Sequence, residues 1–173
     1  CFPIGFTFGI VLVARRATAA VRVVQLKSCG LGILAGRTLA CGVLLVAFDL
    51  YRAAVIAGST DNNHQKSVTL SKEAEAVGVD GLLLTVPAYN KPSQEGLFQH
   101  FKAIAESTSL PGLLYNVPSR TSLNMTADTT LRLAEIDNIV GVKEASSDPD
   151  QITRIIDEAP DDFRIWSGND NET

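Results

Sequence analysis

Residues 112–121, GLLYNVPSRT, and residues 139–148, IVGVKEASSD, decide the fold. In each stretch a short apolar run ends in polar residues, the dipeptide YN in the first and KE in the second. Apolar runs of this length, with polar residues only at their ends, are typical of strands buried on both faces of a sheet. The two stretches therefore predict two strands of a parallel sheet, each ending in side chains that can do chemistry.

The same pattern repeats along the chain after residue 52. Further apolar runs begin at Ala53, Leu82 and Phe163, and successive runs start 24 to 30 residues apart, about one βα unit. Helical periodicity fills the gaps, at residues 65–77, 93–107, 126–134 and 149–159. This strict alternation predicts a parallel sheet with helical crossovers.

The helix at 149–159 has clear start signals. Asp148 is the expected N-cap, Pro149 takes the first helical position, and Gln151 is the expected capping-box partner. Its spacing predicts that Ile155 and Ile156 both face the core.

Two architectures fit the alternation, an open doubly wound sheet and a TIM barrel. No G-x-G-x-x-G sequence follows any strand, which weighs against a dinucleotide site. Polar residues follow all five strands, beginning at Ser59, Tyr89, Tyr115, Lys143 and Ser167. Catalytic groups of TIM barrels come from the carboxyl ends of several strands at once. The sequence therefore favours an α/β fold of the TIM (β/α)8 class, incomplete, with about strands 3 to 7 present.

The first 52 residues differ in character from the rest. All three cysteines lie there, and of the 19 acidic residues only Asp49 precedes residue 51. We predict two segments, an unrelated or out-of-frame one at 1–52 and a partial barrel at 53–173. The chain begins with Cys1 and its single methionine is Met125, so we expect a fragment. A transit peptide is the alternative, but it would precede the first strand of a barrel rather than replace it.

Composition excludes several classes of function. A net charge of -4 and a pI near 5.1 argue against a nucleic-acid partner. No apolar run reaches the 18 or more residues of a membrane helix, and the cysteines lack the spacing of metal ligands. We expect a cytoplasmic protein that binds neither membrane nor metal.

Lys143 is the strongest catalytic candidate. A lysine at the end of a barrel strand has hydrocarbon walls beneath it, and burial lowers the pKa of an ammonium group. The resulting neutral amine can attack a ketone and form an imine, which then withdraws electrons from the neighbouring carbon. The alternative is a structural lysine paired with a carboxylate such as Glu144.

Three further residues are candidates, each with a structural alternative. Tyr115 can relay protons, or it is a packed tyrosine. Arg120 can bind a carboxylate through its planar guanidinium, or it is a surface arginine. Tyr89 lies in the rigid turn VPAYNKP and can reach a site or a partner subunit, or it is an exposed tyrosine. His64 and His100 are predicted to be ordinary residues on helix surfaces.

Taken together, these stretches resemble the dihydrodipicolinate synthase family. The resemblance covers about 120 residues and is carried by these segments: VIAGSTDNN (55–63), TVPAYNKPSQEGLFQHFKAIAE (85–106), LLYNVPSRT (113–121), IVGVKEASSD (139–148) and WSGND (166–170). It implies a lyase without a cofactor. Pyruvate forms a Schiff base on a lysine and then condenses with aspartate semialdehyde, on the route to diaminopimelate and lysine.

The resemblance also implies a role for each matching residue. Lys143 matches the imine lysine, Tyr115 the proton-relay tyrosine, and Arg120 the arginine that binds the semialdehyde carboxylate. Tyr89 matches a tyrosine lent across a dimer interface, and Gly168 a glycine that lines the pyruvate site. Full-length members are usually homotetramers.

The chain also departs from the family. The G-T-T-G-E stretch, whose threonines complete the proton relay, is absent, so we expect this chain by itself to be an inactive fragment. Lys66 and Ala88 stand where lysine-inhibited members have a glutamate and a tyrosine, near the matching Asn62, which predicts insensitivity to lysine. Two rivals are another lyase of the superfamily, such as an N-acetylneuraminate lyase or keto-deoxy sugar-acid aldolase, and a gene-model product without function.

Overall fold

Five parallel strands form the framework of the protein. The computed structural model describes residues 9–14, 22–25 and 53–169, with side chains from residue 54 onward. The parallel strands are β3 (Ala53–Gly58), β4 (Gly81–Thr85), β5 (Gly112–Asn116), β6 (Ile139–Glu144) and β7 (Arg164–Ser167). They lie in the sheet in the order of the sequence. All five predicted strands are thus confirmed.

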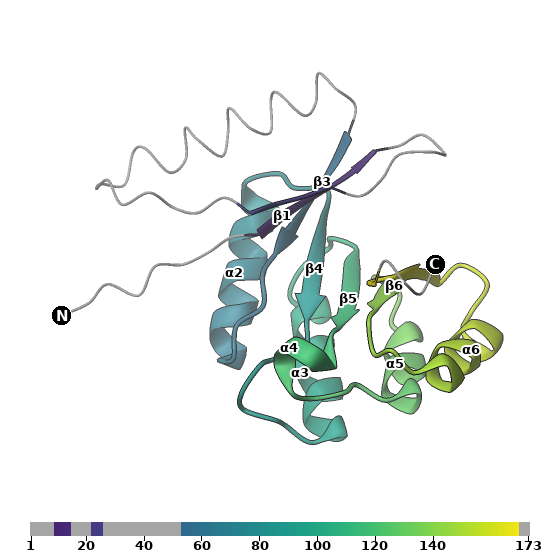
Figure 1. Cartoon of the computed structure of the whole chain (residues 1–173). Coiled ribbons are helices and arrows are strands. Elements are labelled where there is room, and N and C mark those ends of the chain that lie inside the picture. The colour runs from purple at the N-terminus through teal and green to yellow at the C-terminus, as the bar shows by residue number, and fades with distance from the viewer. Residues whose placement is uncertain (1–8, 15–21, 26–52, 170–173) are drawn as a thin grey trace.

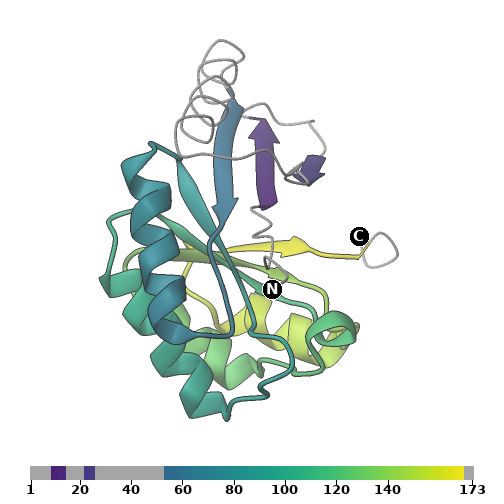
Figure 2. The same ribbon diagram turned by 90° about the vertical axis from the view of Figure 1, so that its left-hand side faces the viewer.

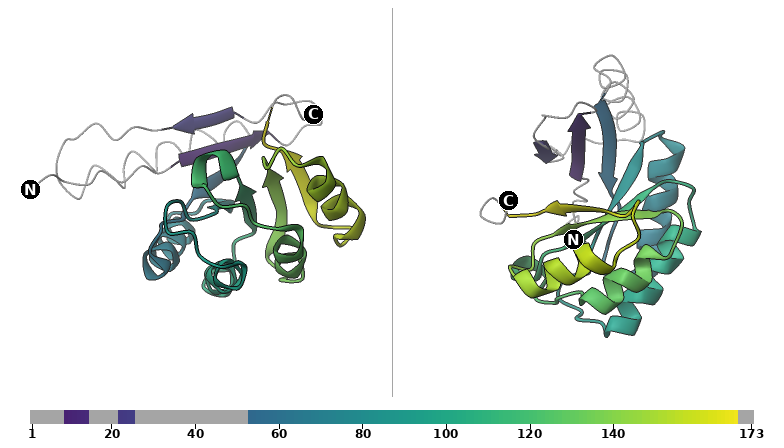
Figure 3. Two further views of the ribbon diagram at one scale, coloured as in Figure 1. Left: turned by 60° about the horizontal axis from the view of Figure 1, so that its bottom comes forward. Right: turned by 90° about the vertical axis from the view of Figure 1, so that its right-hand side faces the viewer.

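Helices connect these strands, and all but the shortest lie on one face of the sheet (Figure 1, Figure 3). They are α2 (His64–Ala76), α3 (Gln94–Glu106), α4 (Pro118–Thr121), α5 (Ala127–Ala134) and α6 (Pro149–Glu158). A doubly wound sheet carries helices on both faces. Successive parallel strands with helices on one face are instead the wall of a (β/α)8 barrel.

The core lies between the sheet and the helices. Leu84, Leu114 and Val142 point from the strands towards the helices and are fully buried. They belong to one apolar cluster with helix residues such as Phe101 and Leu133. Residues of opposite parity, such as Leu83 and Leu113, are only half-buried. The prediction of strands buried on both faces is therefore wrong for the described residues, because their helices cover one face alone.

Two short strands extend the sheet beyond β3. β1 (Gly9–Ala14) pairs antiparallel with β2 (Arg22–Gln25) and with β3. Figure 2 shows β1 lying beside β3, and β2 is the edge strand beyond it. All strands of a (β/α)8 barrel are parallel, so β1, which is antiparallel to β3, does not have the direction of a barrel strand. The predicted boundary at residue 52 lies outside the described residues.

The helix starts follow the sequence signals, with one exception. Asn63 and Ser93 cap α2 and α3, and the Asp148 carboxylate accepts from two backbone amides at the start of α6. The capping-box role of Gln151 is wrong, because its amide turns inward and contacts Asn124 and Glu144. No helix within the described ranges is long and apolar enough to cross a membrane.

Candidate active site

Lys143 and Tyr115 are neighbours on adjacent parallel strands. They are paired in the register of β5 and β6, and the Lys143 Nζ atom lies 4.5 Å from the centroid of the Tyr115 ring. Both side chains are half-buried. Since each is the last or second-last residue of its strand, the amine and the phenol lie together at the carboxyl end of the sheet. The structure thus brings together the two residues predicted to form an imine and relay protons.

The environment of Lys143 favours its neutral form. Burial lowers the pKa of the Lys143 ammonium below its ordinary value of 10.5. None of the ion pairs found within residues 54–169 involves Lys143. A carboxylate partner would have opposed the effect of burial. The alternative of a structural pair between Lys143 and Glu144 is therefore not what the structure shows.

Glu144 instead faces the helices. Successive residues of a strand point to opposite faces, so Lys143 and Glu144 are on different sides of the sheet. The Glu144 carboxylate is 1% exposed and accepts hydrogen bonds from Asn116 Nδ2 (2.9 Å), Ser146 N (2.9 Å) and Gln151 Nε2 (3.3 Å). Burial raises its pKa, and these three donors act in the opposite direction. Sequence reasoning missed this arrangement, although strand alternation was a signal for it.

Arg120 and Tyr89 lie on the segments that follow β5 and β4. Arg120 is exposed in the short helix α4, whose start is fixed by Pro118. Tyr89 is 88% exposed and has a backbone φ of 70°, and Lys91 in the same turn has a φ of 44°. Such angles are uncommon for residues other than glycine and mark a constrained turn. Both side chains are accessible, and their predicted roles stay predictions.

Gly168 follows β7 and packs closely against β6. Its backbone N–H donates to the Glu144 carbonyl oxygen at 2.6 Å. A Cβ atom at this position would lie 2.6 Å from the Cβ of Ala145 and 3.0 Å from that carbonyl oxygen. A glycine is needed for this approach, which keeps the ends of β6 and β7 together. Its predicted role at a pyruvate site stays a prediction.

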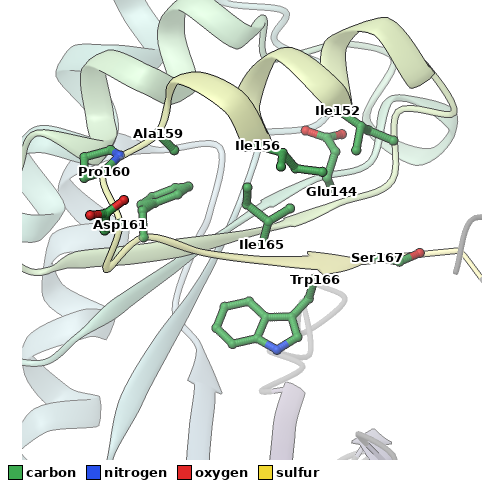
Figure 4. Close-up of a pocket in the computed structure, with 10 residues that line it drawn as sticks. Glu144, Ile152, Ile156, Ala159, Pro160, Asp161, Ile165, Trp166 and Ser167 are labelled. Atoms are coloured by element: carbon green, nitrogen blue, oxygen red, sulfur yellow. The ribbon is translucent and has the colours of Figure 1, made fainter.

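A groove of about 480 Å³ lies between α6 and β7 (Figure 4). Ile152, Ile156 and Ala159 of the α6 region and Ile165 of β7 line it, and neither Lys143 nor Tyr115 does. Ile155 is buried as predicted, but Ile156 is 58% exposed. The prediction of a core position for Ile156 is wrong because its side chain faces this groove.

The prediction for one histidine is also wrong. His64 is exposed at the start of α2, but His100 is 8% exposed and packs edge-on against Phe101. The Nδ1 atoms of His64 and His100 are 3.4 Å apart. Burial, assisted by the neighbouring His64, lowers the pKa of His100 to about 4. His100 is therefore a neutral residue of the helix layer and lies apart from the candidate site.

Comparisons with known proteins agree on one family. The model of the dihydrodipicolinate synthetase family matches residues 46–173. The 4-hydroxy-tetrahydrodipicolinate synthase of Moorella thermoacetica is 65% identical over 122 residues, which make up 70% of this chain and 42% of that protein. The chain thus spans about two fifths of the length of the curated relatives it matches.

Solved structures give the same result. Dihydrodipicolinate synthase from Bacillus anthracis matches with a TM-score of 0.73 and 49% identity, covering 77% of this chain and 45% of that one. The enzyme from Cyanidioschyzon merolae, solved with lysine bound, matches with a TM-score of 0.65 and 44% identity, covering 66% and 39% of the two chains. These matches confirm the predicted fold class, an incomplete TIM barrel.

Proposed function

The chain belongs to the dihydrodipicolinate synthetase family, and from this premise we propose that it carries the imine-forming part of a 4-hydroxy-tetrahydrodipicolinate synthase. The observation that carries the proposal is the contact between Lys143 and Tyr115, with the Lys143 amine half-buried and its pKa lowered. A neutral amine beside a proton-relaying phenol is what imine formation with a ketone requires.

The proposed reaction begins with attack of the Lys143 amine on the keto carbon of pyruvate. The carbinolamine loses water to give an imine, and loss of a proton from the methyl carbon gives an enamine. The enamine carbon then attacks the aldehyde carbon of aspartate semialdehyde, which forms the new carbon–carbon bond. The amino group of the semialdehyde finally adds to the imine carbon and displaces Lys143, so that the amine is regenerated.

Other residues supply protons and binding. The Tyr115 phenol is placed to give and take protons at the imine, and Arg120 offers a guanidinium for the carboxylate of the second substrate. Tyr89, exposed on its constrained turn, is placed to contact a neighbouring subunit. The partners are thus two small molecules and further subunits of a homotetramer, in the cytoplasm. The chemistry needs no cofactor, and we propose no nucleic-acid or membrane partner.

We also propose that the protein does not respond to lysine. Lys66 occupies the position where lysine-inhibited members carry a glutamate, and its Nζ atom lies 2.6 Å from Asp61 Oδ2. This hydrogen bond is the largest cause of the lowered pKa of Asp61. A cation already paired with the carboxylate repels the amine of a second lysine. Calorimetric titration with lysine should give no binding heat, and saturable binding would contradict the proposal.

Borohydride trapping tests the main proposal. The purified chain is incubated with pyruvate, reduced, and analysed by intact mass and peptide mapping. We expect one pyruvyl adduct, on Lys143. A full-length relative that traps pyruvate serves as the positive control, and Lys102, on α3 with its side chain 42% exposed, as the internal negative control. If the full-length control traps pyruvate and the chain does not, these residues do not form the site by themselves.

A further inference from the structure

A set of polar side chains lies behind the candidate site, on the helix side of the sheet. We call it the polar belt. It consists of one carboxylate and four amides from five segments: Gln94, Asn116, Asn124, Glu144 and Gln151. Glu144, Asn116 and Gln151 are at most 9% exposed. Buried polar groups of this kind are stable only when hydrogen-bonded.

Asn116 connects the end of β5 to the segment that returns from α4. Its Nδ2 donates to Glu144 Oε1 at 2.9 Å and to Asn124 Oδ1 at 2.7 Å. Its Oδ1 accepts from the backbone N–H of Met125 at 3.0 Å. One side chain thus joins β5, β6 and residues 124–125.

Gln151 and Gln94 hold the same segment from two helices. Gln151, in α6, donates to the Met125 carbonyl oxygen at 3.1 Å and accepts from Asn124 Nδ2 at 2.8 Å. Gln94, in α3, donates to the Asn124 carbonyl oxygen at 2.8 Å and accepts from the Thr126 N–H at 3.1 Å. Residues 124–126 are therefore fixed to three separate elements.

Two belt residues directly follow candidate site residues in the sequence. Asn116 follows Tyr115, and Glu144 follows Lys143. Arg120 lies on the segment between Asn116 and Asn124, both ends of which the belt holds. The belt therefore determines how the strand ends that carry the amine and the phenol lie relative to the segment that carries the guanidinium.

We propose that the polar belt, with Glu144 as its common acceptor, positions Lys143 and Tyr115 relative to the segment 117–125 that carries Arg120. The inference rests on the proposed function, because it concerns how the residues of that site are held. Glu144 is a positioning residue, since its carboxylate faces away from Lys143 and accepts hydrogen bonds from two amides of the belt and from the Ser146 N–H.

A carboxylate suits this position better than an amide would. Glu144 receives three N–H donors on its two oxygens. In Glu144→Gln, one oxygen becomes an NH2 group, and one donor then faces another donor in a buried place. Asn124→Ala removes three belt hydrogen bonds, one with Asn116 and two with Gln151, but leaves the carboxylate buried and bonded. The two variants therefore perturb the belt in different ways.

Asn138 provides a matched control at the opposite end of the sheet. Like Asn124, it is half-buried and precedes a secondary-structure element, and its Nδ2 donates to the carbonyl oxygens of Ala105, Thr108 and Leu110 at 2.9 to 3.3 Å. It directly precedes the first residue of β6, whereas Lys143 lies near the other end of that strand. Asn138→Ala should therefore lower stability without changing the site.

The experiment combines two readouts on the full chain and on the variants Glu144→Gln, Asn124→Ala and Asn138→Ala. Hydrogen exchange followed by mass spectrometry reports local opening of residues 117–125. Borohydride trapping with pyruvate reports imine formation on Lys143 as a function of pH. We expect the two belt variants to speed exchange of 117–125 and to slow trapping, each by about tenfold, from the loss of buried hydrogen bonds. Asn138→Ala should change neither the exchange of residues 117–125 nor the rate of trapping, even if it lowers the melting temperature as much as the belt variants do.

Two results would overturn the inference. One is unchanged exchange of residues 117–125 in both belt variants. The other is a loss of trapping that follows the loss of melting temperature equally in all three variants, which would make the belt merely structural. Should Glu144→Gln fail to fold, Asn124→Ala decides by the same readouts. If the unaltered chain traps no pyruvate, the proposed function fails, whereas the exchange comparison still tests the belt.

Discussion

The two ends of the parallel sheet use polar side chains in different ways. At the amino end, Asn138 donates to three backbone carbonyl oxygens, Asp80 Oδ2 accepts from the Val55 N–H at 2.7 Å, and Glu75 accepts from the N–H and hydroxyl of Ser109. Most of these bonds satisfy backbone groups of nearby loops. They stabilise the turns, and each of these three side chains is already hydrogen-bonded.

At the carboxyl end, polar side chains lie on both faces of the sheet. Asn116 and Glu144 face the helices and bind one another, while Tyr115 and Lys143 face the other way. Bonding within the belt fixes the strand ends, and the residues of opposite parity stay available to a ligand. The carboxyl end thus differs from the amino end in one respect. Its strands carry hydrogen-bonded polar groups on one face and polar groups that are available to a ligand on the other.

The largest expected effect separates chemistry from stability at Lys143. Lys143→Met keeps the hydrocarbon stem and removes the amine, so pyruvate trapping should be lost completely. Because burial disfavours the ammonium, we expect the free energy of unfolding to stay the same or to rise by about 1 kcal/mol or less. Trapping by mass spectrometry and urea unfolding at pH 7 measure the two effects. An adduct elsewhere on the chain in Lys143→Met would contradict the assignment.

The second prediction concerns the helix layer, which both ends share. The folded pKa of His100 is about 4, below its ordinary value of 6.5. The unfolded chain therefore binds more protons between these values, and stability falls as the pH drops from about 6.5 to about 4, by at most about 3 kcal/mol.

The His100→Leu variant isolates this contribution. It removes the titrating ring and its buried Nε2 atom, for which the described residues offer no hydrogen-bond partner. Urea unfolding at pH 7, 5.5 and 4 should show a smaller loss of stability on acidification for the variant than for the unaltered chain. Parallel losses in both chains would rule out a role for His100.

The third prediction compares a glycine at each end. Gly168→Ala places a Cβ atom against Ala145 and the Glu144 carbonyl oxygen, and should cost about 1 to 3 kcal/mol and disturb trapping. Gly81→Ala, at the amino end, meets the Pro111 carbonyl oxygen at 3.1 Å and should lower stability alone. Thermal melts and trapping test the pair. If Gly168→Ala and Gly81→Ala lose the same amount of stability and also the same amount of trapping, the two ends of the sheet do not differ in their effect on the site.

The smallest effect is expected on the outer surface. Arg132 pairs with Glu95 at 2.9 Å and lies 4.0 Å from the Phe98 ring, but both charged side chains are at least half exposed. Arg132→Ala should therefore cost about 0.5 to 1 kcal/mol, less in high salt, and leave trapping unchanged. Urea unfolding at two salt concentrations measures it. A larger loss of unfolding free energy in Arg132→Ala would contradict the prediction that this exposed contact between helices contributes little.

Most of the fold could be predicted because it depends on local patterns. Short apolar runs and helical spacing located all five parallel strands and the four longer helices between them. The rest depends on contacts distant in sequence. His100 is buried because α2 packs against α3, and Gln151 turns inward because Asn124 and Glu144 lie beside it in space.

The candidate site was predictable only in part. Strand alternation placed Lys143 and Tyr115 at strand ends, and their neighbouring register then followed from the parallel sheet. The polar belt was not predicted, because its amides are common residues whose partners are at least 7 positions away in the sequence. The density of Asn and Gln beside the site residues was the one available signal.

The alternation of Lys143 and Glu144 also limits how this gene can change. Insertion or deletion of one codon within β6, ahead of Lys143, would exchange the faces of the two residues. The amine would then point into the helix layer, and the carboxylate would take its place at the site. A substitution in this strand alters one side chain at a time, whereas a change of its length by one residue would exchange the faces of the two groups in a single event.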